Sequence, residues 1–297
     1  MPAMPENVTA CPLCGSPDSR LFDERVFRGH TVVNRLCRGC GLVYQSPRMT
    51  AAELDAFYAR EYRQVYQGSE GPTPKDLAAQ RGRAESLLGF LRAAGVSPTR
   101  HLDIGASAGI LLRRFGEAFG CQSVGVEPGE AYRAYARGQG LTLYADLDAL
   151  RAADEAPFDL VSMAHVLEHL PDPVGYLAAL KDGVLAADGV LLLEVPNLYA
   201  HDCFEVAHLT SFSPHTLRQT LLQAGYTVMA LHRHGQPRSE LLPLYLTALA
   251  HPARGKPPAV QPERGVARKR RGGLLRRRAL ERLFPHRAWK PLKGEDA

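Results

Sequence analysis

The chain has 297 residues, of which 45% are hydrophobic and 23% charged, a composition typical of a globular protein of about two domains. It contains no run of eighteen apolar residues, and its first seven residues have neither the basic patch nor the apolar stretch of a signal peptide. We therefore expect a cytoplasmic protein and not a membrane-spanning one.

The formal net charge of +5 is unevenly distributed along the chain. Residues 252–297 contain fourteen Lys and Arg against four Asp and Glu, so the remaining body is mildly acidic. A protein with a general affinity for nucleic acid would spread positive charge over a folded face. Charge alone therefore leaves the partner of this basic segment open between RNA, an anionic membrane surface and no partner at all.

Four of the six cysteines form two Cys-x-x-Cys pairs near the N-terminus: Cys11, Cys14, Cys37 and Cys40. Two thiolates on each tight turn can face one ion, and two such turns complete a tetrahedral shell of four sulfurs that suits Zn²⁺. Because the protein supplies all four ligands, the predicted zinc is structural and not catalytic. We predict a small zinc-ribbon-like module over residues 1–48.

Residues 49–77 are predicted to form a helical linker, since Thr50 and Glu53 have the spacing of a capping box. Over residues 78–251, short apolar strands alternate with helices, as in a parallel sheet that is covered on both faces. The predicted strands lie at 102–104, 122–126, 141–144, 158–163, 190–195, 227–231 and 242–250.

The first strand of this domain ends in an acidic residue and a loop of small residues that opens a helix. The loop residues of interest are Asp103, Gly105, Ala106, Ser107 and Gly109. Open α/β sheets bind nucleotides at this carboxyl edge, where glycine lets the backbone approach the ligand closely. Glu127 ends the next strand, twenty-two residues after Gly105, and is placed to accept hydrogen bonds from ribose hydroxyls. A carboxylate beside the loop would repel a pyrophosphate but suits a cationic ligand.

Together with the strand-end segment from Phe158 to Pro173, which reads FDLVSMAHVLEHLPDP, these residues resemble the class I S-adenosylmethionine-dependent methyltransferases. The resemblance extends over roughly residues 78–250. It implies a Rossmann-like α/β fold with a seven-stranded sheet, mostly parallel with the last strand antiparallel, and S-adenosylmethionine as cofactor. The zinc-ribbon-like module would precede this domain.

The resemblance also implies contacts for each part of the cofactor. Asp103, Gly105 and their neighbours would flank its methionine part, and Glu127 would bind its ribose. Asp146 and Leu147 would contact the adenine edge. Finally, Ala164 and His165 would line the side from which the methyl group leaves.

A similar cysteine module precedes the catalytic domain of some bacterial sugar methyltransferases, notably C-methyltransferases of deoxysugars. In the polar loop after the fifth strand, His208 matches the histidine of those enzymes, but Glu205 stands where their tyrosine is expected and Ala207 where their glutamate is expected. We therefore expect methylation of an acceptor hydroxyl, most simply on a sugar or nucleotide sugar, with His208 as general base. His165 and Glu205 are the other candidate catalytic residues.

Two alternatives stay open. The first is an RNA methyltransferase that grips phosphates through the zinc module and the basic tail. The second is a cofactor-binding scaffold without turnover.

Residues 252–297 are interpreted as a flexible basic tail with a short amphipathic helix at about 273–284, which could also contact an anionic membrane.

Overall fold

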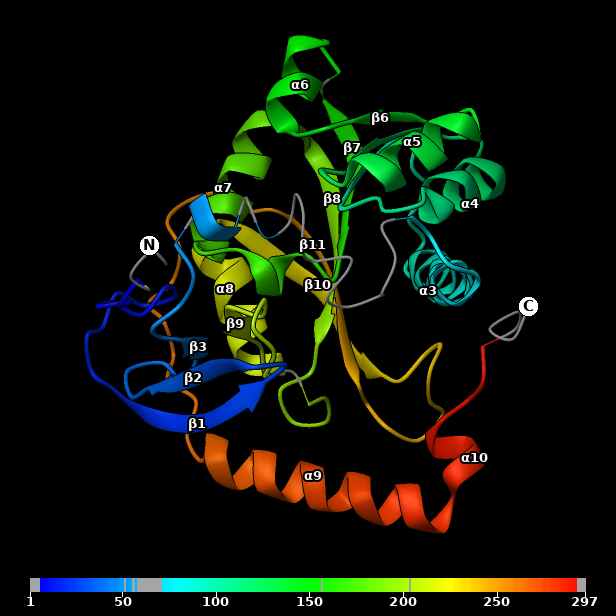
Figure 1. The fold of residues 1–297 in the computed structure, drawn as a ribbon. Coiled ribbons are helices and arrows are strands. Elements are labelled where there is room, and N and C mark those ends of the chain that lie inside the picture. The colour runs from blue at the N-terminus through cyan, green and yellow to red at the C-terminus, as the bar shows by residue number, and fades with distance from the viewer. Residues whose placement is uncertain are drawn as a thin grey trace.

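The computed structural model describes residues 6–50, 52–54, 57, 71–155, 157–202 and 204–292. At its centre lies a seven-stranded sheet in the order β10-β11-β8-β7-β4-β5-β6 (Figure 1). The strands are β4 (Arg100–Ile104), β5 (Gln122–Val126), β6 (Thr142–Tyr144), β7 (Phe158–Ala164), β8 (Leu185–Pro196), β10 (Tyr226–His234) and β11 (Tyr245–Pro252). β11 runs antiparallel to β8 and β10, and the remaining ladders of this sheet are parallel. The predicted fold class is confirmed.

Helices cover both faces of this sheet (Figure 1). On one face lie α3 (Pro74–Ala93), α4 (Ile110–Phe119) and α5 (Glu130–Gly138), and on the other lie α6 (Leu147–Ala152), α7 (Pro173–Gly183) and α8 (Pro214–Gln223). The short η1 (Leu167–His169) follows β7. Apolar side chains from each helical layer are buried against the strands, which fixes the carboxyl ends of β4, β5 and β7 beside one another.

The cysteine-containing segment forms a second, smaller sheet of order β1-β2-β3-β9. It consists of β1 (Ser19–Phe27), β2 (His30–Cys37), β3 (Val43–Gln45) and β9 (Thr210–Ser211). β9 belongs to the loop that follows β8 of the large sheet, and it pairs antiparallel with β3. The N-terminal module is thus joined to the larger domain by a shared sheet.

The predicted capping box forms, because the Thr50 hydroxyl accepts a 3.3 Å hydrogen bond from the Glu53 backbone N–H, and the Glu53 carboxylate accepts one of 2.8 Å from Thr50. Most of the predicted helix that follows falls on residues 58–70, which lie outside the described residues. The linker is therefore described only at its two ends.

The basic C-terminal segment contains α9 (Val266–Leu283) and the short α10 (Pro285–Ala288). The predicted helix started at about residue 273, but α9 begins seven residues earlier, before the helix-weakening pair Gly272-Gly273. Tertiary contact explains the difference, since the α9 backbone at Gly273 lies against the carbonyl of Tyr199, where a Cβ atom would collide. In the part of the chain that the structure describes, no helix has the length and apolar character needed to cross a membrane.

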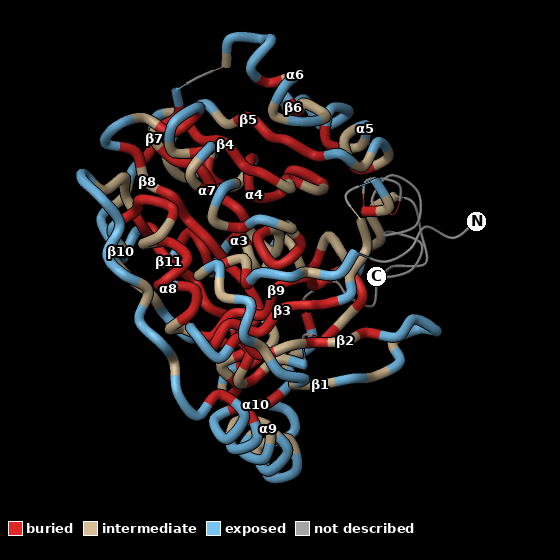
Figure 2. Tube along the Cα trace, turned by 90° about the vertical axis from the view of Figure 1, so that its left-hand side faces the viewer, coloured by how far each residue is buried: buried red, intermediate tan, exposed pale blue. Residues whose placement is uncertain are grey.

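Burial follows the strands of the large sheet, whereas α9 is mostly exposed (Figure 2). Several charged or titratable side chains nevertheless lie in the interior. Glu194 has no exposed surface, Glu168 is 1% exposed, and Asp103 is 4% exposed. Buried carboxylates are costly unless they have partners, so they direct attention to the region between β4, β7 and β8.

Candidate active site

A cavity of about 860 Å³ opens at the carboxyl edge of the large sheet. The loop after β4 forms one wall, and its backbone is left-handed at Gly105 (φ 76°) and Ser107 (φ 50°). A Cβ atom at Gly105 would lie 2.5 Å from the Val166 side chain, so only glycine fits there without a shift. Ser107 adopts the same left-handed region, which explains how it replaces a glycine of the family motif.

The cavity is lined by nearly all the residues predicted to bind the cofactor. These are Asp103, Gly105, Ala106, Ser107, Glu127, Asp146, Leu147, Ala164 and His165. Gly109 does not line it and instead precedes the first residue of α4, with φ 73°. His208 and Glu205, two of the three predicted catalytic residues, also lie outside the lining.

Two buried carboxylates give the cavity its negative character. The Glu127 carboxylate accepts hydrogen bonds of 2.8 Å from the backbone N–H groups of Ser107 and Gly129. Asp103 accepts a 2.6 Å hydrogen bond from the Ser162 hydroxyl. The pKa of Asp103 is raised to about 7, mainly by burial and further by the charge of Glu127, although the hydrogen bond from Ser162 lowers it. A cationic ligand would favour the ionised form of Asp103.

Asp146 and Leu147 also line the cavity, and they are the N-cap and the first residue of α6. One oxygen of the Asp146 carboxylate accepts a 2.7 Å hydrogen bond from the backbone N–H of Ala149, which caps the helix. Asp146 therefore has a structural role in addition to lining the cavity.

His165 lies at the end of β7 with a left-handed backbone (φ 57°), an uncommon conformation for a residue with a side chain. Its Nδ1 is 3.3 Å from Glu168 Oε1, and its Nε2 is 3.2 Å from Glu194 Oε1. Burial and the Arg83 charge lower the pKa of His165, but these two carboxylates outweigh them and the pKa is raised. An imidazole held between two carboxylates, which stabilise its protonated form, is poorly suited to act as a base.

Glu194 is the centre of a buried network that sequence reasoning missed. Arg83 of α3 donates a 2.8 Å hydrogen bond to it, and the Thr247 hydroxyl donates one of 3.3 Å. His234 Nε2 lies 3.4 Å from the second Glu194 oxygen. A single carboxylate in the apolar run of β8 was the one available signal for this network. Arg83 also lines the cavity.

Next to this network, Glu168, His169 and His208 bring one ligand atom each to within 4.8 Å of one another, and all three side chains are buried. Neither Glu168 oxygen has a hydrogen-bond partner among the described residues. Burial raises the pKa of Glu168, but the surrounding histidines, His165 first, lower it to about 2, so this carboxylate is ionised. We define these three residues as the Glu-His-His cluster.

The two histidines of the cluster come from different elements. His169 lines the cavity. Its Nδ1 lies 2.9 Å from the Ala207 carbonyl oxygen. Because a carbonyl oxygen only accepts hydrogen bonds, the proton is assigned to Nδ1, and Nε2 is left for the cluster. His208 packs edge-to-face on His169 with 4.8 Å between ring centres, and its Nε2 is 4.0 Å from Glu205 Oε2. The structure thus places His208 one side chain away from the cavity wall, with His169 between them.

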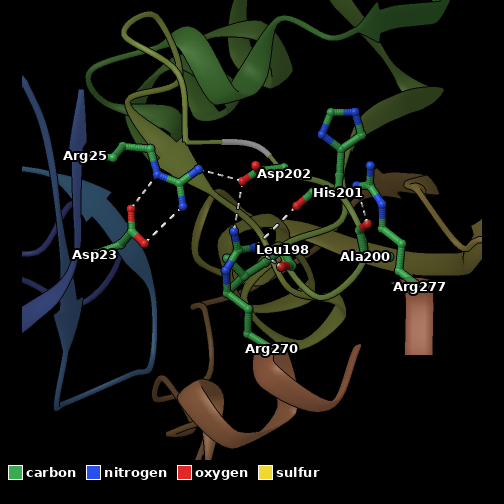
Figure 3. Close-up of polar contacts among 8 residues, drawn as sticks. All are labelled: Asp23, Arg25, Leu198, Ala200, His201, Asp202, Arg270 and Arg277. Atoms are coloured by element: carbon green, nitrogen blue, oxygen red, sulfur yellow. Dashed lines mark hydrogen bonds and ion pairs between the residues drawn. The ribbon is translucent and has the colours of Figure 1, made fainter. Parts of the chain in front are cut away.

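The loop that carries His208 is held from two sides. On one side, the Gln45 amide of β3 donates hydrogen bonds of 2.6 and 2.8 Å to the carbonyl oxygens of Glu205 and His208. On the other side, α9 lies along the preceding segment (Figure 3). Arg270 donates to the carbonyls of Leu198 and His201, and it lies 4.1 Å from the centre of the Phe204 ring.

Further arginines complete this support (Figure 3). Arg277 donates a 3.1 Å hydrogen bond to the Ala200 carbonyl oxygen. Asp202 lies between Arg270 at 3.4 Å and Arg25 of β1 at 2.8 Å. The loop between β8 and β9 is therefore fixed by both the N-terminal module and the C-terminal helix, neither of which is adjacent to it in sequence.

The four N-terminal cysteines converge, with their Sγ atoms within 4.8 Å of one another. The Sγ atoms of Cys11 and Cys40 are 3.6 Å apart, and those of Cys14 and Cys37 are 3.5 Å apart. These separations are too long for disulfide bonds, in which the S–S distance is about 2.05 Å. They are close to the distance of about 3.8 Å between two sulfurs that bind one zinc ion tetrahedrally with Zn–S bonds of about 2.3 Å. The donor set fits a zinc ion.

The sequence of the large domain matches a known family. Residues 77–231 match the model of the methyltransferase domain family, which is more than half of the chain. The chain belongs to this family, and the predicted class of enzyme, an S-adenosylmethionine-dependent methyltransferase, is confirmed.

Curated relatives match a shorter part of the chain. A ubiquinone biosynthesis O-methyltransferase of Haemophilus ducreyi is 32% identical over 117 residues, which cover 36% of this chain and 49% of that enzyme. The enzyme of the same name from Pseudomonas aeruginosa is 36% identical over 93 residues, covering 29% of this chain and 40% of that enzyme. The chain thus spans about half the length, or less, of these relatives.

Among solved structures, the 1,6-didemethyltoxoflavin-N1-methyltransferase of Burkholderia thailandensis, bound to 1,6-didemethyltoxoflavin and S-adenosylhomocysteine, is similar in fold. The match has a TM-score of 0.54 with 20% sequence identity, and it covers 77% of this chain and 98% of that one. It supports the assignment of the fold.

Proposed function

We propose that the chain transfers a methyl group from S-adenosylmethionine to a hydroxyl oxygen of a small or glycan-linked acceptor, such as a sugar or nucleotide sugar. The observation that carries this proposal is the position of the Glu-His-His cluster directly behind the wall of the cavity that the predicted cofactor-binding residues line. The curated relatives, named as O-methyltransferases, favour an oxygen acceptor.

In this proposal the buried carboxylates bind the cofactor. Asp103 lies at the end of β4 beside the glycine loop, where it would attract the positive charge of the methionine part. Glu127 would accept hydrogen bonds from the ribose through the lone pairs that Ser107 and Gly129 leave available. Asp146 and Leu147 would contact the adenine, and Ala164 would lie beside the methyl-donor sulfur.

The transfer itself is an in-line displacement that the protein assists by alignment and by removing one proton. The acceptor oxygen forms a bond to the methyl carbon, the sulfur–carbon bond breaks, and S-adenosylhomocysteine leaves. The hydroxyl proton passes to the Glu-His-His cluster, with His208 as the expected base. Glu205 lies 4.0 Å from His208 and would steady its ring. His165 would act through its charge and not as a base, because its pKa is raised.

We further propose that Cys11, Cys14, Cys37 and Cys40 hold one structural zinc ion. The module is small and contributes few apolar side chains of its own, so a metal would supply much of its folding free energy. A rigid module would in turn hold β3 and the Gln45 side chain against the loop that carries His208.

The proposal is tested by incubating the full-length protein with methyl-labelled S-adenosylmethionine and, separately, nucleotide sugars, oligosaccharides and total RNA. Label is expected in a small-molecule or glycan fraction. Label in RNA would support the RNA methyltransferase alternative, and binding without transfer to any class would support the scaffold alternative.

A further inference from the structure

We propose that the Glu-His-His cluster is a binding site for a divalent transition-metal ion, and that this ion takes the hydroxyl of the acceptor. The inference rests on the proposed function for the identity of the acceptor atom, but the ion site itself rests on geometry alone. Glu168 and His169 lie on η1, and His208 lies on the loop before β9, so two segments 39 residues apart converge on one point.

The Glu168 carboxylate is the first reason to place an ion here. It is 1% exposed, and neither of its oxygens accepts a hydrogen bond among the described residues. A buried carboxylate in that condition carries a large desolvation cost. A cation bound between the carboxylate and two imidazoles offsets this cost more fully than the contact with His165, 3.3 Å away, does alone.

The donor set indicates the kind of ion. Two imidazole nitrogens with one carboxylate oxygen suit manganese, iron, cobalt or zinc, whereas Mg²⁺ and Ca²⁺ prefer oxygen ligands alone. Three protein ligands leave coordination positions free, in contrast to the closed set of four cysteines. The Ala207 carbonyl oxygen at 2.9 Å from His169 Nδ1 would fix that ring so that Nε2 meets the ion.

The free positions would face the cavity, because His169 is part of its wall. An ion at this point would bind the acceptor oxygen, lower the pKa of its hydroxyl and align it with the methyl group. With the ion bound, His208 would serve as a ligand in place of the general base of the proposed function, and the hydroxyl proton would leave to solvent through the cavity. An ion with adjacent free positions favours acceptors that carry two neighbouring oxygens, such as the vicinal hydroxyls of a sugar or a catechol.

Titration of the full-length protein with Mn²⁺, followed by the electron paramagnetic resonance signal of the free ion, tests the site directly. Four thiolates bind Mn²⁺ poorly, so the N-terminal cysteines do not interfere. We expect one Mn²⁺ per chain, with affinity more than ten-fold weaker in Glu168→Gln and in His208→Gln. His286→Gln, on the exposed surface of α10, is the matched control and should bind Mn²⁺ like the wild type.

Two results would overturn the inference: wild-type protein that binds no Mn²⁺ at millimolar concentration, or variants that bind it as tightly as the wild type while retaining cofactor binding. Activity separates this inference from the proposed function. A chelator should remove the ion of the Glu-His-His cluster, while elemental analysis shows that the zinc of the four cysteines is retained. Such protein should lose methyl transfer and regain it with Mn²⁺. Full transfer by such protein would reject the ion and leave the proposed function standing. Mn²⁺ binding without methyl transfer to any hydroxyl would support the ion site and reject the proposed function.

Discussion

The side-chain amide of Gln45 donates a hydrogen bond of 2.8 Å to the backbone carbonyl oxygen of His208. Gln45 ends β3 of the cysteine module, and His208 lies just before β9, the strand that pairs with β3. The N-terminal module thus contributes directly to the shape of the candidate acceptor site. This contact gives the module a physical role that needs no contact with nucleic acid.

Replacing Gln45 with Ala should loosen the loop that carries His208 without affecting the cofactor. Two hydrogen bonds would be lost, each worth about 1 kcal/mol, so turnover should fall by up to about 30-fold. Calorimetry should show unchanged affinity for S-adenosylmethionine. Gln139→Ala, on the exposed end of α5, is the matched control. Wild-type turnover in the Gln45 variant would show that the module does not position the loop.

One tightly bound zinc ion per chain is expected in protein purified without added metal, because the four sulfurs converge and two of their pairs already lie near the tetrahedral separation. Elemental analysis measures it, and a Cys37→Ser/Cys40→Ser variant should lose the ion and unfold its module. The zinc proposal fails if wild-type protein contains none, or if the double variant folds fully.

Replacing Glu127 with Ala should weaken cofactor binding about 10- to 100-fold. A charged acceptor of hydrogen bonds contributes roughly 1.5–3 kcal/mol, and its loss also frees the backbone N–H groups of Ser107 and Gly129. Calorimetry gives the affinity directly. Glu130→Ala, an exposed substitution at the start of α5, should bind normally. Equal affinity in the two variants would show that Glu127 does not contact the ribose.

The affinity for S-adenosylmethionine should increase as the pH rises through about 7. Burial raises the pKa of Asp103 to about 7, so the carboxyl group is neutral below that pH and negative above it. The negative form attracts the positively charged cofactor. Asp103→Asn should bind more weakly at pH 8 and should show a flat profile over the same range. A wild-type profile that is flat, or that falls with pH, would contradict this assignment.

Replacing His208 with Gln should leave cofactor affinity unchanged and lower turnover roughly 10²–10⁴-fold, the usual contribution of a positioned base. Near-wild-type turnover of His208→Gln would place the proton acceptor elsewhere, with Glu205 the next residue to replace.

The local features of the large domain could be predicted from sequence. The strand 122–126 was placed at its observed bounds, because alternating apolar strands and helices leave strong local patterns. The loop around Gly105 was recognised for the same reason. Its geometry depends on the left-handed backbone of neighbouring residues and not on distant partners.

Contacts between distant segments could not be predicted. The pairing of β3 with β9 joins residues more than 160 positions apart, and each strand is too short to leave a pattern. The same holds for Arg83 and Glu194, which are 111 residues apart in sequence, and for Arg270, which resembled one more charge of a solvated tail. In each case tertiary contact, and not local propensity, decides the role of the residue.

The most direct test of methyl transfer to oxygen is to identify the product. Wild-type protein is incubated with S-adenosylmethionine carrying a ¹³C-labelled methyl group and the acceptor found in the labelling experiment, and the product is examined by NMR. We expect a methyl signal with the chemical shift of a methyl ether, formed with one equivalent of S-adenosylhomocysteine. A methyl signal bound to carbon or nitrogen would contradict methyl transfer to oxygen.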